Sequence, residues 1–131
     1  MDSNLLLKNI SKHVRLTESE ERLIVSLLSE EQVKRNEFLI QQGETCQYIY
    51  FVNTGTLRAY FINAQGKEST IMFAVSDWWI TDMYCFLNRL PAMVCLQAVE
   101  RSEVLRLSKN DLDKLLNEIP VFNTFFRILM Q

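Results

Sequence analysis

The sequence predicts a mostly β domain with flanking helices, in which short strands form a sandwich or barrel. Short runs with strand-like alternation follow one another at regular spacing, and the three glycines of the chain stand between them. Apolar residues at helical spacing are confined to the two ends. With 131 residues and 48% hydrophobic residues, the chain suits one packed domain.

Two short helices are predicted before the strands. The segments 4–13 and 18–28 carry apolar side chains three and four residues apart. Thr17 and Glu20 have the spacing of a capping box, in which each side chain satisfies a free backbone N–H at the helix start. The second helix is therefore expected to begin at Glu18.

Glycine turns are predicted to join the first strands, because glycine readily adopts the positive φ of a tight turn. The glycines and the runs beside them are Gly43 after 38–42, Gly55 between 48–52 and 56–62, and Gly66 between 56–62 and 68–73. Alternation in the run 56–62 places Ala59 and Phe61 on one face and Arg58 and Tyr60 on the other. That strand is expected to be half-exposed.

The C-terminal part is predicted to hold two more strands, over 93–99 and 103–107, and then to return to helix. Ser108 to Asp111 has capping-box character, and Pro120 suits the first turn of a last helix over 121–130. That last helix is apolar on most sides, so either the barrel or a second subunit must cover it.

Charge and composition exclude several classes of function. The net charge of −2 is spread over the chain with no basic stripe, which argues against direct nucleic-acid binding. No uncharged apolar run approaches the roughly 20 residues of a membrane span, so we expect a cytoplasmic protein with no membrane partner. The three cysteines, Cys46, Cys85 and Cys95, form no Cys-x-x-Cys pair and are expected to be buried free thiols.

The order of helices and glycine-punctuated strands resembles the cyclic-nucleotide-binding domain of Crp/Fnr-type bacterial transcription regulators, from about Leu6 to the end. The strongest stretch is 34–44, Lys-Arg-Asn-Glu-Phe-Leu-Ile-Gln-Gln-Gly-Glu, followed by the aromatic-rich run 48–58. The resemblance implies a double-stranded β-helix, a jelly-roll-like barrel, over residues 1–119. It also implies that residues 120–131 begin a dimerisation or linker helix.

Family members hold their ligand with a phosphate-binding cassette, in which backbone amides and an arginine neutralise the cyclic phosphate and a glutamate accepts from the ribose. The resemblance assigns the cassette positions, and hence the candidate ligand-binding residues, to Trp78, Trp79, Ile80, Thr81, Asp82, Arg89, Ala92 and Met93.

Three cassette positions depart from the family pattern. Ile80 replaces a glycine, Thr81 stands at the glutamate position with Asp82 as a shorter substitute, and Ala92 stands at the arginine position. Losing the charged partner of a desolvated phosphate costs on the order of several kcal/mol, which argues against ordinary cyclic-nucleotide binding. Arg89 could reach back to the vacant position or be a solvated loop residue. No other cofactor is predicted.

The resemblance favours a ligand-sensing domain with an unidentified small-molecule effector. It implies a homodimer through the terminal helix, with DNA bound only through a helix-turn-helix domain that this chain lacks. The implied dimer contacts are Phe122, Phe125, Phe126 and Leu129. The alternative is a degenerate domain that acts only in dimerisation or protein interaction. A metal-dependent cupin-type enzyme is disfavoured, because His13 is the sole histidine and catalytic metal sites need several ligands.

Overall fold

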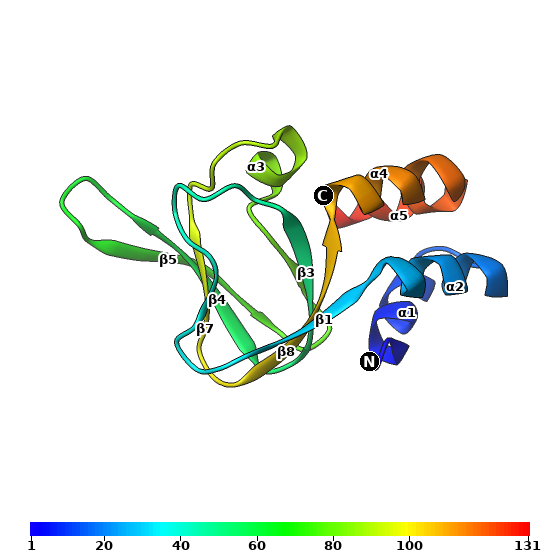
Figure 1. The fold of residues 1–131 in the computed structure, drawn as a ribbon, viewed down its shortest axis with the longest axis horizontal. Coiled ribbons are helices and arrows are strands. Elements are labelled where there is room, and N and C mark those ends of the chain that lie inside the picture. Colours follow the sequence, from blue (N-terminus) through cyan, green and yellow to red (C-terminus); the bar gives the residue numbers. More distant parts are fainter.

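Two four-stranded antiparallel sheets face each other, and α1, α2, α4 and α5 gather at one end of the pair (Figure 1). The computed structural model describes all 131 residues. The helices are α1 (Asn4–Ser11), α2 (Glu18–Leu27), α3 (Met83–Asn88), α4 (Lys109–Glu118) and α5 (Pro120–Leu129). The strands are β1 (Ser29–Val33), β2 (Phe38–Ile40), β3 (Tyr48–Thr54), β4 (Thr56–Ile62), β5 (Glu68–Val75), β6 (Trp79–Ile80), β7 (Cys95–Ala98) and β8 (Ser102–Ser108).

Most neighbouring strands are distant in sequence. The first sheet has the order β1-β8-β3-β6 and the second the order β2-β7-β4-β5. Successive strands therefore cross between the sheets, except for the β4–β5 hairpin, which lies within the second sheet. The predicted mostly β, jelly-roll-like fold with flanking helices is confirmed. Strand β1 was not predicted, and β7 begins two residues later than expected.

Reciprocal hydrogen bonds fix the start of α2. The Thr17 hydroxyl accepts from the backbone N–H of Glu20 at 3.2 Å, and the Glu20 carboxylate accepts from the Thr17 N–H at 2.8 Å. These contacts satisfy two of the free donors at the helix start, and the predicted capping box is confirmed. At the start of α4 the Ser108 hydroxyl accepts from the Asp111 N–H at 3.1 Å.

The turn at Gly55 joins β3 to β4 and requires glycine for two reasons. Its φ of +100° lies in the region that L-residues avoid. A Cβ atom at this position would also overlap the Ser102 side chain on β8. The Ser102 hydroxyl in turn accepts from the Thr56 N–H at 3.1 Å, so β8 holds the turn in place. The predicted glycine turn is confirmed.

The side chains of β4 alternate as predicted from Thr56 to Ala59, and the pairing with β5 then shifts register between Ala59 and Tyr60. Ala59 is buried on the inner face, but β7 pairs with β4 no further than Tyr60. Beyond that point the β4–β5 hairpin projects from the sheets (Figure 1), and Phe61 is 38% exposed although it was expected inside. Tyr60, expected on the exposed face, is buried, with the Arg58 guanidinium lying over its ring at 4.1 Å.

Helix α5 contributes to the core of its own chain. Phe122, Phe125 and Phe126, three of the residues expected at a dimer contact, are at most 5% exposed and pack in the core of this chain. The physical reason is that the apolar face of α5 packs on the barrel, where the Phe125 ring lies 6.1 Å from the Trp79 ring. Leu129 is only partly buried. A subunit contact through the remaining surface of α5 stays a prediction.

Candidate functional site

The candidate site is the cassette segment, residues 76–94, which contains β6, α3 and the loop into β7. Its first part is fastened to the first sheet. The N–H of Asp77 donates to the Val52 carbonyl, and the N–H of Val52 donates to the Trp78 carbonyl, both at 2.9 Å. Strand β6 then pairs with β3, with Ile80 opposite Tyr50. The backbone of the cassette segment is therefore held by the barrel itself.

The two tryptophans of the cassette segment lie in different surroundings. Trp78 is 49% exposed. Trp79 is half-buried, and its indole N–H donates to the side-chain oxygen of Asn9 in α1 at 2.9 Å. The Trp79 ring also meets Phe51 edge-on at a centroid distance of 5.1 Å and Phe125 at 6.1 Å. Trp79 thus contacts the barrel, α1 and α5 together.

Asp77 strengthens the link between the cassette segment and α1. Its carboxylate lies 2.9 Å from the Lys12 ammonium and accepts from the Asn9 side-chain amide at 3.0 Å. These hydrogen bonds, that from Lys12 first, hold the pKa of Asp77 below its usual value. Its φ of +79° is unusual for a residue other than glycine, which shows how strongly the surrounding contacts fix this turn.

Ile80, Thr81 and Ala92, at the family's glycine, glutamate and arginine positions, are buried or hydrogen-bonded to the barrel. Ile80 and Ala92 are each 4% exposed. The Thr81 hydroxyl donates to the Tyr48 carbonyl at 2.8 Å, so it is already engaged. The Ala92 N–H donates to the Glu44 carbonyl at 2.6 Å, which fastens the loop before β7 to the turn after β2.

Asp82, directly before α3, is hydrogen-bonded to the backbone beyond the loop that follows α3. Its carboxylate accepts from the backbone N–H of Met93 at 2.9 Å, across α3 and the following loop. Two thiols lie beside it. Burial, with contributions from Asp82, raises the pKa of the Cys46 thiol to about 12 and raises that of the Cys85 thiol as well. All three cysteines are free and buried, as predicted.

Arg89 points away from the vacant arginine position. It has a left-handed φ of +55°, and its guanidinium donates to the Asn110 side chain at 2.7 Å and lies 3.9 Å from Asp113. It lines a cavity of about 360 Å³ at the start of α4, together with Thr45 and Lys109. The structure therefore does not bring Arg89 to the backbone at Ala92.

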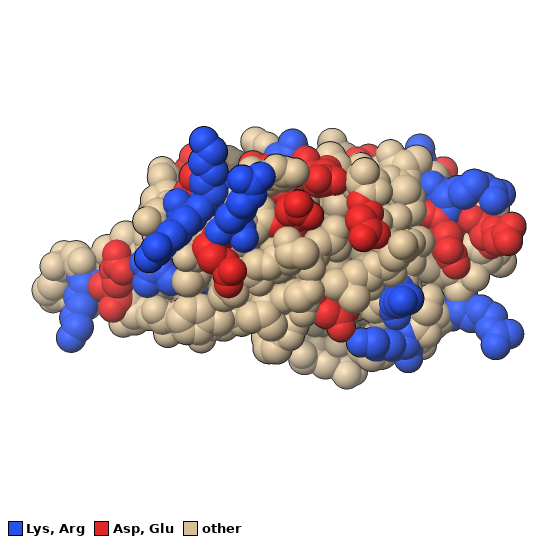
Figure 2. All heavy atoms as spheres, turned by 90° about the horizontal axis from the view of Figure 1, so that it is seen from below, with Lys and Arg blue, Asp and Glu red and all other residues tan.

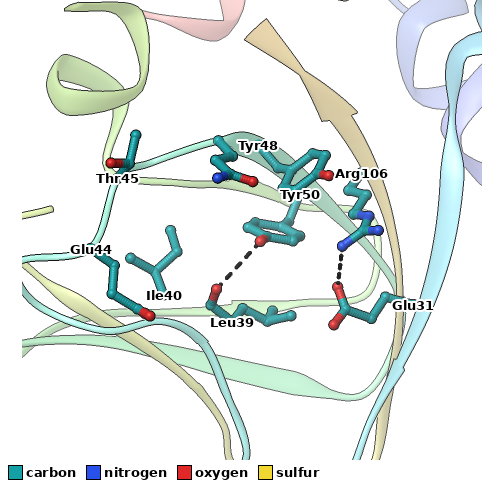
Figure 3. A pocket seen from close by; sticks show the side chains of 9 residues that line it. Glu31, Leu39, Ile40, Glu44, Thr45, Tyr48, Tyr50 and Arg106 are labelled. Carbon is teal, nitrogen blue, oxygen red and sulfur yellow. Dashed lines mark hydrogen bonds and ion pairs between the residues drawn. The ribbon is translucent and has the colours of Figure 1, made fainter. Parts of the chain in front are cut away.

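A second cavity, of about 320 Å³, was not predicted (Figure 3). The Arg106 guanidinium lies 3.1 Å from the Glu31 carboxylate and 4.3 Å from the centre of the Tyr48 ring. The Tyr50 hydroxyl points to the Leu39 carbonyl at 3.4 Å, and burial raises the pKa of Tyr50. The charges of Arg106 and Glu31 are therefore paired with each other inside this cavity. Sequence alternation could have placed Tyr48 and Tyr50 on one face, but not Arg106 beside them.

Basic and acidic side chains are mixed on one face of the molecule. Figure 2 shows acidic side chains among the basic ones over the face that it presents. Such a surface lacks the concentrated positive charge that phosphate backbones attract. None of the helices combines the length and the apolar character that a membrane span requires.

Comparison with known proteins shows the family to which this fold belongs. The model of the cyclic nucleotide-binding domain matches residues 30–119. The anaerobic regulatory protein of Bacillus subtilis (strain 168) is 21% identical over 92 residues, which cover 70% of this chain and 39% of that protein. The chain thus spans about two fifths of the length of this curated relative.

Solved structures show the same fold. The catabolite activator protein of Thermus thermophilus superposes with a TM-score of 0.78 at 23% identity, over 88% of this chain and 54% of that one. The regulatory subunit of a cAMP-independent protein kinase A from Trypanosoma cruzi, bound to guanosine, superposes with a TM-score of 0.72 at 21% identity, over 88% and 40%. The resemblance to Crp/Fnr-type regulators is confirmed, and the chain belongs to the cyclic nucleotide-binding domain family.

Proposed function

We propose that this chain is the ligand-sensing and dimerisation domain of a Crp/Fnr-type transcription regulator. The observation that carries the proposal is the position of Trp79, which belongs to the cassette segment and packs on Phe125 of the terminal helix. A ligand that binds one position of β6 better than another would also shift the preferred position of α5. Such differential binding is what a sensor needs to pass on a signal.

The ligand we propose is not a cyclic nucleotide bound in the family's usual way. No guanidinium lies at Ala92, and Arg89 is engaged at α4. The buried Ile80 side chain fills space where the family has glycine. A cyclic phosphate would therefore lose its water without gaining a charged partner. The similar regulatory subunit from Trypanosoma cruzi is bound to guanosine, a nucleoside without a phosphate, which supports a ligand of that class here.

The proposed partners, DNA and a second copy of the chain, follow from the assignment to a transcription regulator. The relatives are regulators, and the curated one is much longer than this chain. DNA would be contacted by a helix-turn-helix domain outside this chain. We propose a homodimer through the surface of α5 that the barrel leaves free, which includes the partly buried Leu129, and through the exposed Met130 that follows the helix.

A domain used only for dimerisation or protein interaction is the second candidate. The observation that favours it is the closure of the cassette segment, where Ile80 and Ala92 are buried and Thr81 is hydrogen-bonded to β3. We also infer that the domain binds rather than catalyses, because the single histidine, His13, lies beside the Phe125 ring with a centroid distance of 6.1 Å.

A thermal-shift titration tests the proposal. The purified chain is heated with cyclic AMP, cyclic GMP or guanosine at about millimolar concentration, because a ligand that binds only the folded state raises the melting temperature. We expect no shift with either cyclic nucleotide. A shift with guanosine would favour the sensor, and no shift with any probe would favour the interaction domain. A clear shift with cyclic AMP would contradict the proposed cassette.

A further inference from the structure

The carboxylate of Asp82 occupies a backbone donor of the cassette segment. Met93 directly follows Ala92, and its N–H is the first main-chain donor after the N–H of Ala92, which is bound to the Glu44 carbonyl. Asp82 accepts from this Met93 N–H at 2.9 Å. The donor is therefore already used within the chain.

We propose that Asp82 determines the specificity of this site by acting as a built-in anion, which occupies the Met93 N–H and excludes ligands that carry a phosphate. The inference rests on the proposed function and deepens it, since it names the class of ligand that the site admits. A ligand of this site is uncharged or cationic at the part that faces Asp82.

Two physical effects support the exclusion. A phosphate at this position would have to displace the carboxylate from its hydrogen bond, and an unpaired carboxylate and phosphate side by side would repel each other. The nearest arginine in sequence, Arg89, does not compensate, because its guanidinium is held by Asn110 and Asp113.

The raised pKa values of Cys46 and Cys85 fit the same picture. Burial is the main cause in both thiols, and the negative charge of Asp82 acts in the same direction. Both side chains therefore lie within the electrostatic reach of this carboxylate. An anionic ligand placed beside these thiols would likewise be repelled by the negative charge of Asp82.

The experiment compares cyclic AMP with adenosine on three variants of the whole chain, by calorimetric titration. Ala92→Arg supplies the missing guanidinium, Asp82→Ala/Ala92→Arg also removes the carboxylate, and Asp111→Ala/Ala92→Arg is the matched control. Asp111 is another acidic residue near a helix start, and no hydrogen bond engages its carboxylate. We expect the Asp82 double variant to bind cyclic AMP about tenfold or more tightly than the other two. Adenosine binding should be the same in all three.

Equal cyclic AMP affinities in the three variants would overturn the inference about Asp82. Binding of cyclic AMP by the unmodified chain would instead contradict the proposed function, so the two failures are distinguishable. Ala92 is buried, and its arginine variants could unfold. For that case the single variant Asp82→Ala is titrated with inorganic phosphate while the Met93 amide is followed by NMR. A saturable shift in Asp82→Ala that is absent from the unmodified chain supports the inference, and its absence from both overturns it.

Discussion

The indole N–H of Trp79 donates to the side-chain oxygen of Asn9 at 2.9 Å, and the amide of the same Asn9 donates to the backbone and the carboxylate of Asp77. One side chain of α1 therefore holds two residues of the cassette segment. Because Trp79 also packs on Phe125, α1, β6 and α5 form one connected unit.

Replacing Asn9 should loosen this unit. The change Asn9→Ala leaves the half-buried Trp79 N–H without its partner, which typically costs about 1–3 kcal/mol. Urea unfolding would measure the lowered free energy of unfolding. Asn117→Ala, on the exposed side of α4, is the matched control and should change it by less than about 0.5 kcal/mol. Equal effects of the two changes would show that the Asn9 contacts contribute nothing.

The Asp77 contacts should make stability depend on pH. The folded-state pKa of Asp77 is lowered, so its contribution is present above the unfolded-state value of about 4 and is lost as the pH falls through the folded-state value. We expect Asp77→Asn to lower the free energy of unfolding at neutral pH and to have little effect near pH 2. Denaturant unfolding at both pH values measures the difference. A penalty that does not change with pH would contradict the ionic contribution.

The turn at Gly55 should not tolerate a side chain. Gly55→Ala adds a Cβ that overlaps Ser102 and forces a left-handed φ, so we expect a loss of about 2 kcal/mol or more. Gly66→Ala is a matched control, because Gly66 has a similar φ of +79° but open space around its Cβ position. The melting temperature of Gly55→Ala should fall clearly further than that of Gly66→Ala.

Two changes, one in α5 and one at the residue that follows it, should separate packing from dimerisation. Phe125→Ala creates a core cavity and is expected to cost about 3–5 kcal/mol. Met130→Lys, at a side chain that is 48% exposed, should leave the monomer stable and weaken the dimer. Sedimentation velocity measures the mass, and urea unfolding measures stability. A chain that keeps the same mass after Met130→Lys would argue against this part of the helix as the interface.

The buried thiols should be slow to react. A thiol is modified through its thiolate, and the Cys46 pKa of about 12 leaves little thiolate at neutral pH. We expect modification of Cys46 and Cys85 by a thiol reagent only after unfolding in denaturant, as read by mass spectrometry. Rapid labelling of the folded chain at either cysteine would contradict their burial.

The sequence predicted the elements that local chemistry defines. The capping box at Thr17 and the glycine turn at Gly55 were correct because each depends on a few neighbouring residues. Strand β1 was missed because Ser-Glu-Glu-Gln-Val shows no apolar alternation, and only pairing with β8 makes it a strand. The burial of Tyr60 coincides with a register shift between β4 and β5, and the exposure of Phe61 with the end of the pairing to β7; no local pattern reveals either.

In the candidate site, too, the sequence pattern does not reveal contacts between distant residues. The motif pattern predicts that Ala92 stands at the family's arginine position, but it does not predict which contacts replace those of the arginine. Asp82 was expected as a short substitute for the glutamate, whereas it binds the Met93 N–H. The direction of the Arg89 side chain follows from its left-handed backbone and from the position of α4. Such long-range contacts become visible only in three dimensions.

The most direct test of this account is a calorimetric titration of the unmodified chain with cyclic AMP. The closed cassette, without an arginine at Ala92 and with Asp82 on the Met93 N–H, predicts no saturable heat up to about millimolar ligand. Saturable binding with a dissociation constant of about micromolar would contradict it, and would show that the cassette opens and neutralises a phosphate by means that this structure does not contain.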